Sequence, residues 1–180
     1  MQSVLLLRLL QLASPSLPIG AYTYSQGLES AIEKGLVYHE QSAREWITES
    51  LNIIGDFEAP IAWRLMKAFS RRDSVAVNHW TECFIAARDT AEFRAETIQM
   101  GYSLGKLVID LKIADESLQS ILSDQPEIPL PTAFACAAEA LGVPHEAALL
   151  GMLFSLVENQ MLVCVKSVPL GQVSGQSLLF

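Results

Sequence analysis

Apolar residues recur at every third or fourth position through almost the whole chain, and this spacing restricts its fold more than any other feature. Ala43, Ile47, Leu51 and Ile54, for example, lie on one face of a helix. Only LVCVKSV, residues 162–168, has enough alternation to form a short strand. We therefore predict an all-α fold, a single-domain helical bundle of about eight or nine helices over residues 1–180.

Helix start and stop signals divide the chain into these segments. SARE, residues 42–45, has the pattern of a capping box, and Gly55 is expected to end the helix that follows. The polar, proline-rich residues 115–131 are predicted to form a loop around a short helical turn. Further helices are expected to begin at Asp56 with Pro60, at Asp73, at Thr90 (to about Ala114), at Thr132 (to Gly142) and at Pro144 (to about Val165).

Two long apolar segments raise the question of a membrane or a secretion signal. The opening MQSVLLLRLLQLASPS resembles a signal peptide, but no positive charge precedes its apolar run and Arg8 falls inside it. Arg8 and Gln11 form a narrow polar stripe, which favours a helix packed into a core with one edge in water. The run from residue 147 to 165 carries Glu158, Asn159 and Gln160, which a bilayer disfavours. We expect a buried helix, no membrane contact and a cytoplasmic protein; a secreted helical protein is the alternative.

Charge and cysteine content narrow the classes of partner. The net charge is −8 and no run of lysines or arginines is present, which argues against nucleic-acid binding. Cys83, Cys136 and Cys164 are widely separated among apolar residues, as is typical of reduced core thiols in a cytosolic protein. With 51% hydrophobic residues and a mean hydropathy of +0.29, the chain is more apolar than a typical solitary monomer. This surplus indicates apolar surface reserved for partners.

Convergent catalytic groups are scarce. His39, His79 and His145 are far apart, and we expect none of them to form a metal-ligand pair with a second His or a Cys three or four residues away on a helix. The chain has no P-loop, no dinucleotide-binding glycine pattern, no G-x-S-x-G elbow and no C-x-x-C motif. We therefore expect a protein that is not an enzyme and that holds no cofactor and no metal.

One group of polar residues lies around the start of the helix predicted from Thr90. Arg88, Glu92 and Glu96 stand four apart and are predicted to stack on one helical face, as a solvated ion-paired surface or as a binding surface.

Arg94 stands at the end of a small and apolar face of the same helix. Gly101 and Gly105 continue that face, and each costs about 1 kcal/mol relative to alanine inside a helix. Their presence predicts the close approach of another backbone. That backbone belongs either to the interior of the domain or to a second subunit.

A second group interrupts the long apolar helix after Pro144. Ser155, Asn159 and Lys166 are expected on one face, with Glu158 beside them. Because unpaired burial of such groups costs on the order of 1 to 3 kcal/mol each, they must pair internally, line a hydrated passage or face a partner.

The third group is the corner LASPSLPIGAYTYSQGLE. Its two prolines end the first helix, Gly20 allows a turn, and Ser25 is a candidate cap for a helix that ends at Gly35. Tyr22 and Tyr24 are rigid amphipathic side chains of the kind used at interfaces, or they pack with their hydroxyls bonded.

Three segments together resemble the UreF family of urease accessory proteins. They are LLQLASPSLPIGAYTYSQGLESAIEKGLV near the start, ARDTAEFRAET at residues 87–97, and VKSVPLGQVSGQ at residues 165–176. The resemblance implies an all-helical, usually dimeric protein without catalytic activity. Such a protein acts as a chaperone of metallocentre assembly: it bridges the UreD (also called UreH) accessory protein and the UreG GTPase and helps nickel insertion into apo-urease. The residues that it implies for partner binding are Tyr22, Tyr24, Ser25, Gln26, Glu29, Arg88, Glu92, Arg94, Glu96, Lys166, Pro169, Gly171 and Gln172.

The chain departs from the family pattern in two places. Ala21 and Thr23 stand where the family usually has glycine and serine, and the chain ends at Phe180, where family members generally continue with another helix and a tail. A different function stays open beside the bridging role. In it the protein regulates the GTPase activity of UreG, with Arg94 as the group that stabilises phosphoryl-transfer charge.

Overall fold

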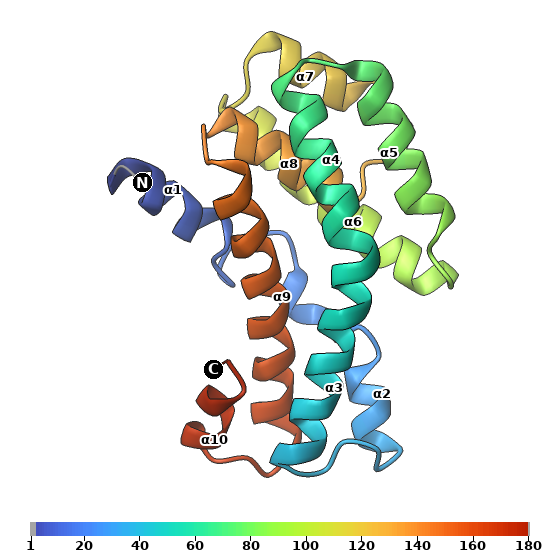
Figure 1. The fold of residues 1–180 in the computed structure, drawn as a ribbon, viewed down its shortest axis with the longest axis vertical. Helices are drawn as coiled ribbons and strands as arrows, with labels where there is room; N and C mark the ends of the chain where they lie inside the picture. Colours follow the sequence, from blue (N-terminus) through green and yellow to red (C-terminus); the bar gives the residue numbers. More distant parts are fainter. Residues whose placement is uncertain (1–2, 180) are drawn as a thin grey trace.

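Ten α-helices and no strand make up the described part of the chain, residues 3–179 of this computed structural model (Figure 1). The helices are α1 (Ser3–Leu12), α2 (Leu28–Glu33), α3 (Glu40–Ile53), α4 (Ala59–Ser70), α5 (Ser74–Ala86), α6 (Ala91–Asp110), α7 (Glu116–Ser123), α8 (Leu130–Ala140), α9 (His145–Ser167) and α10 (Gln172–Ser177). The predicted all-α bundle is confirmed. It has one helix more than expected because the six-residue α10 carries no start signal that we recognised. Residues 1, 2 and 180 of the predicted domain lie outside the described part.

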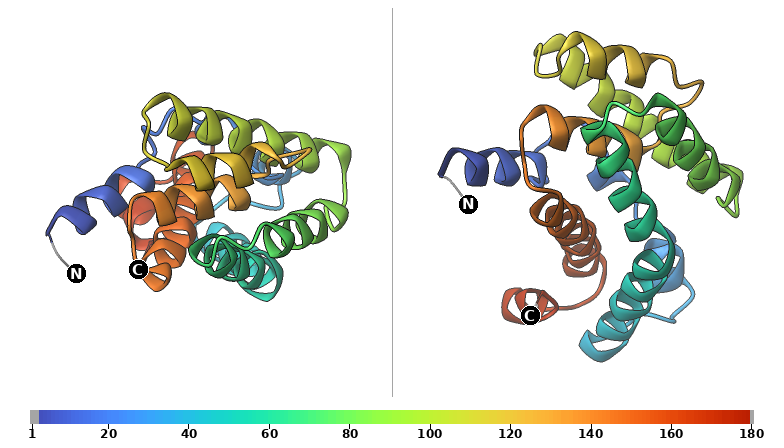
Figure 2. Two further views of the ribbon diagram at one scale, coloured as in Figure 1. Left: turned by 90° about the horizontal axis from the view of Figure 1, so that it is seen from above. Right: turned by 45° about the horizontal axis from the view of Figure 1, so that its top comes forward.

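Helix α8 forms the centre of the larger of two hydrophobic clusters. All residues from 131 to 138 are buried, and α4, α6, α7 and α9 pack around them (Figure 2). The alanines of this stretch allow the neighbouring helices to approach closely. The smaller cluster joins α2, α3, α10 and the second half of α9. Helix α9 therefore runs through both clusters, and α3 lies beside it in the lower half of Figure 1.

The segment α3 to α4 corrects two predictions. Gly55 does not end the helix, because Ile54–Glu58 form a π-turn that joins α3 directly to α4. The capping box is also three residues earlier than predicted. The Ser42 main-chain N–H donates to His39 Nδ1 at 3.0 Å, and the His39 N–H donates to Ser42 Oγ at 3.1 Å. The N-terminus of α3 is thus capped by an imidazole, a side chain that was not among the predicted caps.

The other predicted starts have mixed outcomes. Asp73 and Thr90 cap α5 and α6 as expected, since each side chain accepts from a main-chain N–H three residues on. Thr132 is not a cap: α8 begins two residues earlier, and the buried Thr132 hydroxyl pairs with that of Thr81 at 2.9 Å. Helix α6 ends at Asp110, four residues before the predicted end. The candidate strand at residues 162–168 is wrong, because α9 continues helically to Ser167.

The glycines of α6 face the interior of the protein. A Cβ at Gly101 would lie 2.0 Å from the Ile128 carbonyl oxygen and 2.5 Å from the Pro129 carbonyl carbon. Thr97 lies at the same crossing, where its hydroxyl accepts from the Leu130 N–H at 3.1 Å. The predicted close approach of a backbone is confirmed for Gly101, and that backbone belongs to the same domain. Gly105 is also buried, but it meets only side chains, of which Leu122 Cδ2 is nearest at 3.4 Å.

Helix α1 is buried on one side only, which corrects the prediction of a core helix with one wet edge. Leu9 packs against Gly151 of α9, but Val4, Leu7 and Leu10 are 58%, 66% and 58% exposed. Figures 1 and 2 show α1 extending sideways from the bundle. Arg8 lies on the attached side and donates to the Leu141 carbonyl at 2.7 Å. An unpartnered apolar strip therefore lines the outer side of α1.

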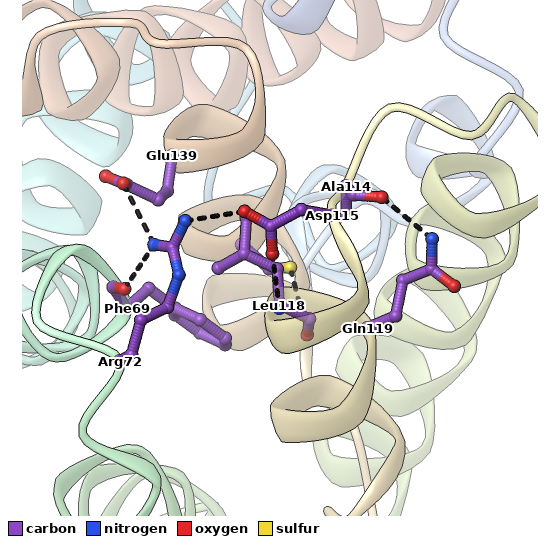
Figure 3. A network of polar contacts seen from close by, with 8 residues as sticks. Phe69, Arg72, Ala114, Asp115, Leu118, Gln119 and Glu139 are labelled. Atoms are coloured by element: carbon purple, nitrogen blue, oxygen red, sulfur yellow. Dashed lines mark hydrogen bonds and ion pairs between the residues drawn. The ribbon is translucent and has the colours of Figure 1, made fainter.

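A polar network fixes the end of the bundle where α4, α7 and α8 meet (Figure 3). Arg72 follows α4 with φ 55 and donates to Asp115 Oδ2 at 2.9 Å and to Glu139 Oε1 at 3.0 Å. Its Nη1 also donates to the Phe69 carbonyl at 2.8 Å. Asp115 at the same time caps α7 by accepting from the Leu118 N–H. One guanidinium thus ties three helices together at their ends.

Candidate functional site

The first predicted segment forms a tight corner between α1 and α2. Gly20 adopts φ 79 and begins a 3₁₀ turn over Ala21–Thr23. Gln26 and Gly27 then take φ 50 and φ 86, a conformation that is costly for glutamine. Gly27 is the N-cap residue of α2, in the place that Ser25 was a candidate for; Ser25 Oγ accepts from the Glu29 N–H at 3.4 Å.

Two amide side chains of α9 hold this corner in place. Asn159 Nδ2 donates to the Tyr24 carbonyl at 2.8 Å, and Gln160 Nε2 donates to the Ser25 carbonyl at 3.0 Å. Internal pairing, one of the alternatives for the polar residues of α9, is therefore confirmed for Asn159. Glu158 beside it is partly buried, which raises the pKa of its carboxyl.

The two tyrosines differ in their surroundings. Tyr22 is 61% exposed, whereas Tyr24 is half-buried. Both line a small cavity of about 50 Å³ together with Asn159 and Gln26. Glu29 is exposed on the first turn of α2.

A larger pocket of about 370 Å³ brings the first and second predicted segments together. Gln26 of the first segment and Arg88 and Glu96 of the second line it, along with Met152 and Leu156 of α9. Burial raises the pKa of Glu96. This pocket therefore brings together predicted site residues from two of the three segments.

Arg88 does not stack with Glu92 and Glu96 as predicted, because it precedes α6 and turns toward the π-turn. Its Nη1 donates to Glu58 Oε1 at 2.7 Å, and the two side chains are only 15% and 16% exposed. The guanidinium carbon also lies 4.2 Å from the centre of the Phe84 ring. The ion pair closes the pocket wall between the π-turn and α6.

Glu92 and Arg94 point away from this pair. Glu92 is exposed on the first turn of α6, where its own main-chain N–H and the Thr90 hydroxyl hold the pKa of its carboxyl below the usual value. Arg94 Nη2 donates to Glu127 Oε2 at 2.6 Å, with both side chains substantially exposed. Neither residue lines the pocket.

The third segment lies at the far end of α9, away from the pocket. Lys166, Pro169, Gly171 and Gln172 are all exposed. Helix α10 begins here and packs on α9. Arg44 of α3 donates to the Ser177 carbonyl at 2.8 Å and so fastens α10 to the bundle. The predicted site residues therefore form two separate surfaces.

Several residues of the pocket were missed by sequence reasoning. Trp46 and Glu49 of α3 and Glu58 of the π-turn all line it. The indole Nε1 of Trp46 is buried there without an acceptor. No spacing rule could bring these residues to α6, because the π-turn that directs Glu58 toward Arg88 has no sequence signature.

The described residues offer binding surfaces rather than reactive groups. Among residues 3–179 no three His, Cys, Asp or Glu side chains converge as a metal site. The expectation of no His–Cys pair on a helix is wrong at one place. His79 stands four residues before Cys83 on α5, and Cys83 Sγ lies 3.8 Å from His79 Nε2. Burial raises the pKa of Cys136 to about 12 and that of Cys164 to about 11, so both thiols are protonated and unreactive.

One helix in the described part, α9, has the length and apolarity to cross a membrane. It contacts six other helices of the bundle, and its central amides hydrogen-bond to the first segment. The predicted burial holds for only part of it, since Leu150 and Phe154 of this helix are 61% and 49% exposed. These contacts are those of a core helix with one open face.

Comparison with known proteins identifies the family. A UreF family model matches residues 37–180. The chain belongs to the UreF family. It is 74% identical over 174 residues to the urease accessory protein UreF of Nitrosospira multiformis, an alignment that covers 97% of this chain and 77% of the relative. It is 67% identical over 180 residues to the UreF of Janthinobacterium sp. (strain Marseille), covering 99% of this chain and 80% of that one.

Membership of the UreF family extends over all three predicted segments. The family model includes the second and third, and the alignments with the two UreF relatives reach nearly the whole chain. The UreF of Dechloromonas aromatica is 46% identical over 178 residues, with 97% of this chain and 77% of the relative covered. All three relatives are named as accessory proteins of urease.

Proposed function

We propose that this chain is a cytoplasmic, non-enzymatic chaperone of urease maturation that bridges the UreD (UreH) accessory protein and the UreG GTPase during nickel insertion into apo-urease. The observation that carries the proposal is the separation of the predicted residues into two surfaces. One surrounds the corner and pocket of the first two segments, and the other lies at the far end of α9. A bridging protein needs two surfaces that can be occupied at the same time.

The exposed apolar side of α1 supports a third contact, with a second copy of the chain. Val4, Leu7 and Leu10 lie more than half exposed on one helix, and α9, against which α1 packs, also has two exposed apolar side chains, Leu150 and Phe154. An exposed apolar strip like that of α1 marks an interaction site. We include a homodimer in the proposal for this reason.

Co-purification tests the bridging role. Tagged UreD and UreG are each mixed with the wild-type chain and with the Lys166→Ala and Arg94→Ala variants, and capture is measured together with urease activation. Both side chains are exposed, so we expect normal folding and loss of one partner by each variant. Unchanged capture and activation with both variants would remove these two residues from the site; failure of the wild-type chain to capture either partner would refute the bridging role.

The regulatory alternative makes a different prediction for Arg94. To act on the GTPase site, its guanidinium would have to leave Glu127, to which it donates at 2.6 Å. Single-turnover GTP hydrolysis by UreG, with and without this chain, separates the two functions. An unchanged rate favours the scaffold, and an acceleration lost in Arg94→Ala favours the regulator.

A further inference from the structure

The 370 Å³ pocket has an unbalanced set of charges on its wall. Glu49, Asp89 and Glu96 line it, and none of them has a hydrogen-bond or ion-pair partner among the described residues. The single guanidinium of the wall, Arg88, is already paired with Glu58. A pocket with three free carboxylates attracts a cation and repels phosphate and other anions.

The same wall also has donors without acceptors. Trp46 Nε1 and Arg88 Nε are buried and make no hydrogen bond. A buried donor without a partner is unfavourable, which makes the Trp46 indole N–H a sensitive reporter of any change in the packing of this wall. Both nitrogens are buried away from the open space of the pocket, so it is the unbalanced charge of the wall that selects an occupant.

Aromatic rings complete the wall and select the kind of cation. Trp46, Phe57, Phe84 and Phe93 line the pocket, and the Arg88 guanidinium already lies 4.2 Å from the centre of the Phe84 ring. Guanidinium stacks on aromatic faces and is weakly hydrated, whereas the lysine ammonium is a strongly hydrated point charge. The wall thus suits a second guanidinium more than an ammonium.

We propose that this pocket receives an arginine side chain from a loop of a partner protein, with the guanidinium among Glu49, Asp89 and Glu96. The proposal rests on the proposed function in that it needs a protein partner. The net charge of −8 favours a basic partner over a second copy of this acidic chain.

The test is a titration of the ¹⁵N-labelled chain, followed at the Trp46 indole N–H signal, which the Trp46→Phe variant assigns. The probes are N-acetyl-argininamide, its neutral analogue N-acetyl-citrullinamide and the apolar N-acetyl-norleucinamide. Because a single residue makes few contacts, we expect saturation by the arginine probe only in the millimolar range, and at least fivefold weaker binding of the other two.

Two glutamate variants provide the matched comparison. Glu96→Gln removes one wall charge and should weaken the arginine probe at least fivefold, while folding normally because burial already disfavours the charge. Glu45→Gln changes an exposed residue of α3 outside the pocket and should leave the affinity unchanged.

Several outcomes would overturn the proposal: no shift at about 50 mM probe, equal binding of citrullinamide or norleucinamide, or no effect of Glu96→Gln. A change in oligomeric state caused by Glu96→Gln, without arginine binding, would assign the pocket to a second copy instead. The titration uses this chain alone, so its failure is distinct from a failure to capture UreD or UreG.

Discussion

Replacing Gly101 by alanine tests how closely α6 approaches the segment before α8. The added Cβ would lie 2.0 Å from the Ile128 carbonyl oxygen and within 2.7 Å of the Pro129 carbonyl group. These are main-chain atoms and cannot rotate away as a side chain can. Overpacking of a core costs about 1–3 kcal/mol, and we expect about 3 kcal/mol here because all three contacts involve backbone. Alanine regains about 1 kcal/mol of helix propensity, which leaves a net loss of about 2 kcal/mol.

Gly105→Ala is the control on the same helix. Its nearest atom would be Leu122 Cδ2 at 3.4 Å, the flexible end of a side chain, so the propensity gain should leave this variant at least as stable as the wild type. Thermal unfolding followed by circular dichroism at 222 nm measures both. For a chain of 180 residues the expected loss corresponds to a midpoint lower by about 4–8 °C for Gly101→Ala. A Gly101→Ala variant as stable as Gly105→Ala would refute the close approach of the two backbones.

Three further changes probe the ion pair, the acid limit of stability and the thiols. Arg88→Met leaves the mostly buried Glu58 unpaired and should lower the free energy of unfolding by about 2 kcal/mol, with recovery when Glu58→Gln is added; a double-mutant cycle in urea checks this. The hydrogen bond from the Leu118 N–H, and after it that from Arg72, lower the pKa of Asp115 in the folded protein. The ionised carboxylate therefore stabilises the folded state at pH values above the pKa of the unfolded chain, and this stabilisation is lost as the pH falls through the lower pKa of the folded state. Stability should therefore fall less between about pH 5 and pH 3 in Asp115→Asn than in the wild type, and equal slopes would contradict the assignment. At about pH 8 a thiol reagent should label only Cys83 in the native chain and all three cysteines in urea, since the other two are buried with raised pKa values; two labels in the native state would contradict their burial.

Local signals in the sequence were sufficient wherever a helix end is satisfied by its own neighbours. The side chains of Asp73 and Thr90 accept from main-chain N–H groups three residues on, so the local sequence is enough to locate both helix starts. Thr132 has the same residue chemistry, but its hydroxyl meets Thr81 of another helix. A cap and a buried interhelical pair have identical sequence patterns, and only the fold distinguishes them.

The candidate site was harder to predict because its contacts join distant parts of the chain. Arg88 pairs with Glu58, thirty residues earlier, and not with the glutamate four residues ahead. The glycines of α6 did indicate a close approach from their cost alone, yet nothing in the sequence showed that the approaching backbone is that of Ile128 and Pro129. The cost of a glycine inside a helix indicates that another part of the chain packs closely there, whereas the topology of the fold decides which part it is.

Helix α9 is a rigid element that carries contacts to both predicted surfaces. Its central residues Asn159 and Gln160 hold the corner of the first segment, and its last turn carries Lys166 of the third. From residue 145 to 167 it is a single unbroken helix, so the two surfaces keep a fixed separation and orientation. A bridging protein of this construction needs no conformational change to present both surfaces at once.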